Sequence, residues 1–129
     1  MNQQTVAALG RLLLAGLFLF SGLGKIMAPE GTQAYIAAAG LPFPLLGYLA
    51  AIAVELGGGI LLLLGYRTRI VAWAMAAFTI AAALCFHNHF ADQNQLVHFL
   101  KNIAIAGGLL QVAAFGAGGL SLDARARRA

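Results

Sequence analysis

Four ionisable side chains interrupt otherwise apolar stretches of this sequence: Arg11, Lys25, Glu55 and Lys101. Glu55 is the most conspicuous, because it stands near the centre of its stretch, roughly 15 Å from either end if the stretch is helical. An ionised group in hydrocarbon costs about 2.5–3.5 kcal/mol on insertion scales, so each should face protein and take a partner. Glu55 therefore pairs with a basic residue to join helices, contacts another subunit, or carries a proton or binds a ligand in a cavity.

Further polar residues gather near the ends of two later stretches, where His87, His89, His98, Lys101 and Asn102 occur. The three histidines could supply metal ligands, and two on neighbouring helices could hold a haem. A quinone head group is favoured over haem or metal, because its carbonyl oxygens need donors such as histidine, lysine or asparagine near a membrane interface. Alternatively, the histidines are solvated and the lysines extend to the interface. The candidate ligand-binding residues are Arg11, Lys25, Glu55, His87, His98, Lys101 and Asn102, with Glu55 the candidate proton carrier and His87, His89 and His98 the candidate metal set.

The composition is that of a membrane protein. Of the 129 residues, 61% are hydrophobic and 9% are charged, whereas ordinary soluble domains are about 45–50% apolar and about 25% charged. So few charges cannot cover a soluble surface, which excludes a cytosolic enzyme. The net charge of +4 comes with no basic stripe, which excludes a nucleic-acid binder. The one cysteine, Cys85, excludes a disulfide framework and a Cys-x-x-Cys motif.

Four apolar stretches are long enough to cross a membrane, which takes roughly 20 residues of helix. We expect an all-α fold, a four-helix transmembrane bundle with antiparallel up-down topology. A short interfacial helix over residues 31–39 should separate the first two spans, because proline and glycine signals bracket it. The chain is then one integral membrane domain, 1–129, with spans at about 6–27, 45–64, 70–86 and 97–115.

Small and polar residues recur at spacings of three and four within three of the spans. Such spacing places them on one face of a helix, and small residues let a neighbouring helix approach closely. The predicted inner faces are Arg11, Ala15, Phe18, Gly22 and Lys25 on the first span, Ala51, Glu55, Gly58, Gly59 and Leu62 on the second, and Lys101, Ala104, Gly108 and Gln111 on the fourth.

The distribution of basic residues predicts the orientation. With four spans, both termini and the 65–69 connection share one side, which carries six arginines, while the other side carries Lys25 and Lys101. Loops rich in Lys and Arg stay cytoplasmic, so both termini should be cytoplasmic. The six are Arg11, Arg67, Arg69, Arg125, Arg127 and Arg128.

Four segments form a recognisable pattern when they are taken in order. They are Gly10-Arg11 with Phe20-Ser21-Gly22, Lys25-Ile26 and Ala39-Gly40-Leu41-Pro42; Val54 to Gly59 with Leu64-Gly65 and Arg67; His87 to Phe90 with Phe99 to Asn102 and Gly107 to Leu110; and Gly118 to Asp123. Together they resemble the DoxX family of small bacterial inner-membrane proteins. The resemblance implies a four-helix membrane bundle and an association with quinone-linked oxidoreductase complexes, including a thiosulfate:quinone oxidoreductase, or with redox-stress assemblies. It brings no agreed catalytic residue; the polar positions that match the family's pattern are Arg11, Lys25, Glu55, His87, His89, Lys101 and Asn102.

The leading hypothesis is a DoxX-like inner-membrane protein that serves as a quinone-interacting or accessory subunit of a membrane oxidoreductase. The chain has no obvious electron carrier of its own, so an enzymatic role would be that of a subunit. One alternative is a non-catalytic scaffold or interaction subunit, and a third is a component of a small oligomeric transporter. The expected contacts are the lipid bilayer, other membrane or redox proteins and further copies of the chain.

Overall fold

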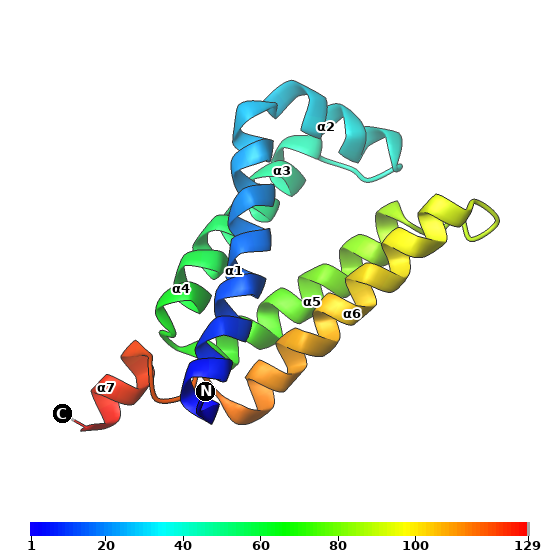
Figure 1. The fold of residues 1–129 in the computed structure, drawn as a ribbon. Helices are drawn as coiled ribbons and strands as arrows, with labels where there is room; N and C mark the ends of the chain where they lie inside the picture. Colours follow the sequence, from blue (N-terminus) through cyan, green and yellow to red (C-terminus); the bar gives the residue numbers. More distant parts are fainter. Residues whose placement is uncertain (129) are drawn as a thin grey trace.

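The computed structural model describes residues 1–128, and these residues form helices and short connections (Figure 1). Asn2 caps the first helix by accepting a hydrogen bond from the backbone N–H of Thr5 (2.9 Å), and Asp92 caps a later helix through Asn94 N–H (2.9 Å). In chain order the elements are α1 (Gln3–Met27), α2 (Pro29–Ala38), α3 (Pro44–Ile52), the π-helix η1 (Ala53–Gly58), α4 (Gly59–Leu64), α5 (Thr68–Phe86), α6 (Gln93–Phe115) and α7 (Leu122–Arg128).

Within residues 1–128, four helical segments are long and apolar enough to span a membrane, which confirms the all-α, four-span fold. The second span is continuous from Pro44 to Leu64 but passes through α3, η1 and α4. The segments extend the expected ranges mainly at their amino ends, because polar capping residues precede the apolar stretches. They are Gln3–Met27, Pro44–Leu64, Thr68–Phe86 and Gln93–Phe115.

The short helix expected at 31–39 is α2, which begins two residues earlier because Pro29 occupies its first position. The final helix, α7, was not expected. Ser121 starts it, since its hydroxyl accepts a hydrogen bond from Ala124 N–H (3.1 Å). The basic tail is therefore a structured part of the protein.

The four spans form two pairs arranged as a V (Figure 1). One arm consists of α1 and the second span, and the other is the α5–α6 hairpin. The arms meet at the end where both chain termini lie, which we call the terminal end, and diverge toward the opposite, open end, where α2 runs from one arm toward the other. Between the arms, Ala15, Leu62, Met75 and Leu109 form the centre of the core, each with no more than 1% of its surface exposed.

The buried faces agree with two of the three predicted faces. Arg11, Ala15, Phe18 and Gly22 are the buried residues of α1, and the face containing Glu55, Gly59 and Leu62 is buried on the second span.

The predicted face of α6 was wrong. Lys101, Ala104 and Gln111 are exposed, and the helix packs through a parallel row of small and apolar residues, Ala106, Leu109 and Ala113. Lys101 lies about two turns into α6, and its long side chain can extend toward the amino end of the helix and the membrane interface without facing protein.

The segment between α6 and α7 is hydrogen-bonded to α1 at the terminal end. The buried guanidinium of Arg11 donates to the carbonyls of Leu62 (3.3 Å) and Leu120 (2.6 Å), joining α1 to the end of α4 and to the tail. Gly65, at φ +69°, ends α4, and a side chain there would collide with Arg11. Arg11 therefore adds a second donor to the Leu62 carbonyl, which also accepts the Gly65 N–H (3.2 Å), at the end of α4 where carbonyls run out of helical donors.

Asp123 completes this junction from the other side. Its carboxylate accepts hydrogen bonds from the backbone N–H groups of Arg67 (2.7 Å) and Thr68 (2.9 Å), and its own N–H donates to the Gly65 carbonyl (2.9 Å). A residue of α7 thus caps the first turn of α5. Burial raises the pKa of Asp123, but hydrogen bonds from Thr68 and Arg67 and the charge of Arg127 outweigh it and hold the pKa below its usual value.

Candidate functional site

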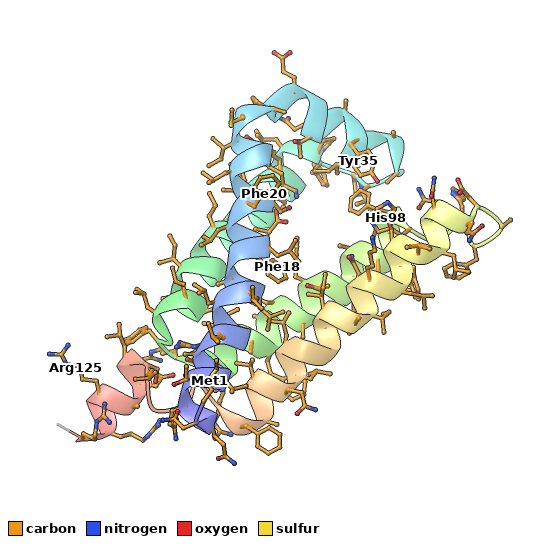
Figure 2. The ribbon with its side chains drawn as sticks, viewed as in Figure 1. Met1, Phe18, Phe20, Tyr35, His98 and Arg125 are labelled. Atoms are coloured by element: carbon orange, nitrogen blue, oxygen red, sulfur yellow. The ribbon has the colours of Figure 1, made fainter. Side chains whose placement is uncertain are left out.

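A cavity of about 710 Å³ lies between the two arms, toward the open end. Residues of α1, α2, α3, η1, α5 and α6 line it, and most are apolar, among them Phe18, Ile36 and Ile105. Figure 2 shows Phe18 in the angle between the arms and Tyr35 at the open end. The volume is within the roughly 300–1,000 Å³ range of small-molecule sites.

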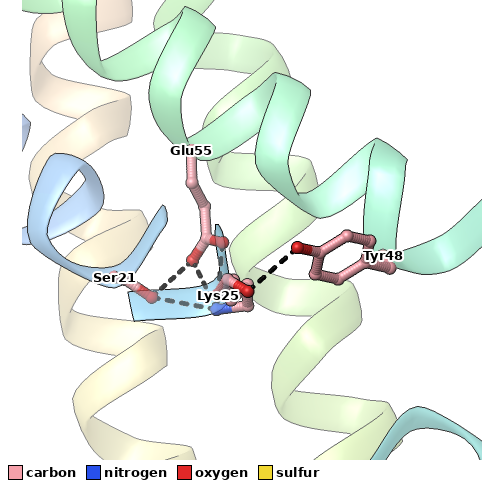
Figure 3. A network of polar contacts seen from close by, with 4 residues as sticks. All are labelled: Ser21, Lys25, Tyr48 and Glu55. Carbon is pink, nitrogen blue, oxygen red and sulfur yellow. Dashed lines mark hydrogen bonds and ion pairs between the residues drawn. The ribbon is translucent and has the colours of Figure 1, made fainter. Parts of the chain in front are cut away.

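A group of three polar side chains lies in the wall of this cavity (Figure 3). The ammonium of Lys25 is 3.0 Å from Glu55 Oε1 and 2.9 Å from Oε2. Ser21 Oγ donates to Glu55 Oε1 (2.7 Å) and accepts from Lys25 Nζ (3.0 Å). The carboxylate is therefore held by an ion pair and a hydroxyl, as a charge buried in a membrane requires. We call Ser21, Lys25 and Glu55 the polar triad.

The two partners of this ion pair differ in exposure. The Glu55 side chain is 6% exposed, whereas that of Lys25 is 28% exposed. Tyr48 fixes the backbone beside Lys25, since its hydroxyl donates to the Lys25 carbonyl (3.0 Å) (Figure 3). The ammonium is thus the member of the pair that an incoming molecule can reach more readily.

The π-helix η1 presents Glu55 to α1. A π-helical turn inserts an extra residue into a helix and occurs often at functional sites. Close approach of α1 also requires Gly22, since a Cβ there would lie 2.7 Å from Leu56 Cγ and 3.3 Å from Glu55 Cβ. The sequence therefore brings the carboxylate to Ser21 and Lys25 with a glycine on one helix and an irregular turn on the other.

The α5–α6 arm contributes a second polar region to the cavity. Thr79, His87 and Asn102 line it, together with Cys85. Asn102 Nδ2 makes a long hydrogen bond to the Thr79 carbonyl (3.4 Å), while the Thr79 hydroxyl donates to Met75 O (2.7 Å). Amide and imidazole groups on one arm thus line the same cavity as the polar triad on the other.

The cavity brings together four of the residues selected from the sequence, Lys25, Glu55, His87 and Asn102. The other three lie elsewhere. Arg11 is at the terminal end, and Lys101 is exposed on α6. His98 does not line the cavity but stacks on His87, with ring centroids 5.1 Å apart.

The histidines do not converge as metal ligands within residues 1–128, where no three His, Cys, Asp or Glu side chains form a group that could hold a metal ion. His89 is exposed. The rings of His87 and His98 stack at an interplanar angle of 26°, so they do not face each other from opposite sides of a haem. His87 Nδ1 is instead 3.3 Å from Gln95 Oε1.

Sequence reasoning did not select Ser21, Tyr48 or Thr79. A signal for Ser21 was present, because it lies three residues after Phe18 and four before Lys25, on the same helical face. Tyr48 and Thr79 carried no comparable signal, since hydroxyl residues in apolar helices commonly bond to backbone carbonyls. Thr79 does so within its own helix.

The sequence profile of the DoxX family matches residues 6–88, which include the polar triad and His87. The chain belongs to the DoxX family. It is similar to two proteins of Escherichia coli (strain K12). Inner membrane protein YqjF is 40% identical over 115 residues, covering 88% of this chain and 85% of YqjF. Inner membrane protein YphA is 33% identical over 123 residues, covering 91% of this chain and 87% of YphA.

No solved structure matches the chain. The inner-membrane relatives and the four apolar helices together identify this DoxX protein as a multi-pass protein of the inner membrane. Its exposed apolar side chains therefore contact the lipid bilayer.

Proposed function

We propose that this DoxX-family protein binds a quinone between its two arms and serves as a quinone-interacting or accessory subunit of a membrane oxidoreductase. The observation that supports the proposal is the cavity of about 710 Å³, whose walls are mostly apolar but include the polar triad, His87 and Asn102. A quinone has a flat apolar ring, an apolar tail and two carbonyl oxygens that need hydrogen-bond donors. The cavity offers walls and donors of these kinds.

The residues fit such a ligand in specific ways. Lys25 Nζ donates to Ser21 Oγ and to Glu55 Oε1, which uses two of its three N–H groups and leaves the third for a ligand carbonyl. On the facing arm, the long bond from Asn102 Nδ2 leaves its amide able to donate to a ligand. When bound, a quinone accepts electrons and protons, and Glu55 with Ser21 would hold a proton beside it.

The single cysteine provides a direct test, since Cys85 lines the same cavity. Purified protein is placed in lipid nanodiscs, and the rate of Cys85 alkylation by a membrane-permeant maleimide is measured with increasing amounts of a fully substituted, short-tailed benzoquinone. Full substitution prevents the thiol from adding to the ring. We expect the quinone to slow alkylation saturably.

Matched lysine variants separate specific binding from partition into lipid. Lys25→Met should weaken protection by about tenfold or more, the usual effect of losing a hydrogen bond to a charged group. Lys101→Met removes an equal charge from the exposed face of α6 and should leave protection unchanged. Equal protection in all three proteins, or protection in none, would refute the proposal.

The second candidate is a non-catalytic scaffold or interaction subunit. It is favoured by the polar triad itself, which joins α1 to η1 and resembles a structural interhelical link. In that case Glu55→Gln lowers the thermal stability of the protein or its assembly with a partner, while Cys85 alkylation stays insensitive to the quinone.

We also propose that the terminal end faces the cytoplasm. Arg11, Arg67 and Arg69 lie at this end with both termini, and the basic helix α7 adds three more arginines. Retention of Lys and Arg on the cytoplasmic side supports this orientation. The cavity then lies in the outer half of the membrane.

A further inference from the structure

A second cavity, of about 490 Å³, lies at the terminal end, between the start of α5, the end of α6 and α7. Three arginines from different elements line it: Arg67 before α5, Arg69 in its first turn and Arg127 on α7. All three residues are exposed, so their guanidinium groups can be reached by a molecule in the membrane interface.

The arginines keep most of their hydrogen-bonding capacity. Arg69 Nη1 donates to the Ala114 carbonyl (2.6 Å), which uses one of its five N–H donors. The Arg67 guanidinium carbon lies 5.9 Å from the centre of the Tyr66 ring, a contact that leaves its N–H groups free to bind at the ring's edge. Asp123 also lines the cavity, but both its oxygens already accept backbone N–H groups. The cavity therefore contains three positive charges and one carboxylate that is already hydrogen-bonded to the backbone.

The other edge of the cavity is apolar. Ile70 and Phe115 line it and are 68% and 77% exposed, at the ends of two membrane spans. Trp73, 61% exposed, follows one turn after Arg69 on α5, and tryptophan is enriched at the headgroup level of membranes. The cavity therefore crosses the boundary between the acyl chains and the headgroups.

We propose that this cavity binds the headgroup phosphate of an anionic phospholipid such as phosphatidylglycerol. Arg67, Arg69 and Arg127 bind the phosphate oxygens, which suit the planar fork of guanidinium groups. The acyl chains lie along Ile70 and Phe115. Basic pockets beside transmembrane helices bind acidic lipids in this way.

Membrane orientation alone does not explain this arrangement. Arginines at any position of the terminal end would keep that end on the cytoplasmic side. These three arginines instead line one cavity that has an apolar edge. Arg125 and Arg128 on the same short helix do not line the cavity, and Figure 2 shows Arg125 projecting away from the bundle. They provide a matched control.

Native mass spectrometry measures the binding. Delipidated protein in detergent is titrated with equal amounts of phosphatidylglycerol and phosphatidylethanolamine, and the bound lipids are counted. We expect one phosphatidylglycerol to bind more tightly than the zwitterionic lipid. The double variant Arg67→Gln/Arg127→Gln should weaken it by roughly fivefold for each arginine. Arg125→Gln/Arg128→Gln, with the same loss of charge, should bind as the wild type does.

Three outcomes overturn the proposal: equal binding of the two lipids, equal weakening in both double variants, or displacement of the lipid by inorganic phosphate at equal concentration. The last would indicate a site for a free anion. Arg69 is left unchanged because it also caps α6. If Arg67→Gln/Arg127→Gln does not fold, the single variants Arg127→Gln and Arg125→Gln replace the double variants. Both residues are exposed on α7, and only Arg127→Gln should weaken lipid binding.

Discussion

Lys25 Nζ lies 2.9 Å from Glu55 Oε2, so the cation near the end of the first span neutralises the carboxylate near the middle of the second. The pair crosses from α1 to the π-helical turn of the facing span, and Ser21 bonds to both partners. Both residues line the cavity, so the contact links α1 to η1 within its wall.

Removing one partner of this pair should be costly. Lys25→Met leaves the Glu55 carboxylate buried without its cation, which should lower the free energy of unfolding by about 3 kcal/mol. The double variant Lys25→Met/Glu55→Gln should recover part of the loss, since no uncompensated charge remains. Thermal unfolding in detergent measures both. Additive losses in the double variant would show that the two side chains do not interact.

Gly22 should tolerate no side chain. In Gly22→Ala the new Cβ would lie 2.7 Å from Leu56 Cγ, so α1 and η1 must separate or repack. Overpacking of this kind costs about 1–3 kcal/mol. Gly16→Ala on the same helix is the control, because a Cβ there meets nothing within 4 Å. Equal melting temperatures for the two variants would contradict the close approach of α1 to η1 at Gly22.

Asp123 should make stability depend on acidity. Its carboxyl is held at a lowered pKa in the folded protein, so its contribution is complete above the unfolded pKa near 4 and is lost as the pH falls through the folded value. Asp123→Ala should cost about 1 kcal/mol at neutral pH, as loss of a helix cap does. The difference in melting temperature between wild type and variant should then shrink in strong acid. A difference that stays constant with pH would show that the carboxylate charge plays no part.

Orientation can be measured without a functional assay. An alkaline phosphatase domain, active only outside the cytoplasm, should be inactive when fused after residue 129 and active when inserted in the connection between α5 and α6. A fluorescent protein that matures only in the cytoplasm should give the reverse. The opposite pattern would reverse the proposed side of both cavities.

The sequence predicted much of the fold and the centre of the site. Glu55 could be found because a charge in the middle of an apolar stretch must face protein, and the face carrying Phe18 and Lys25 followed from helical spacing. Spacing within one helix carries no information on which of three cations reaches Glu55. That choice depends on the separation of the arms and on the π-helical turn, which arise from contacts between helices.

The buried face of α6 and the helix α7 also depend on contacts between elements that are distant in the sequence. Residue spacing places Lys101 on an inner face because α6 carries two rows of small residues, and only packing against α5 decides which row is buried. The helix α7 is too short to be stable through its own propensity. It forms where Ser121 caps it and Asp123 binds the start of α5.

The cap that Asp123 gives to α5 also sets an order of events during synthesis. Thr68 is made 55 residues before the carboxylate that receives its N–H, and Arg11 is made 109 residues before its partner carbonyl at Leu120. Both remain without these partners while the later spans enter the membrane. The segment from Leu120 to Asp123, which is made after all four spans, therefore links the first helix to the middle of the chain. A chain that stops before this segment inserts four spans whose shared end lacks that link.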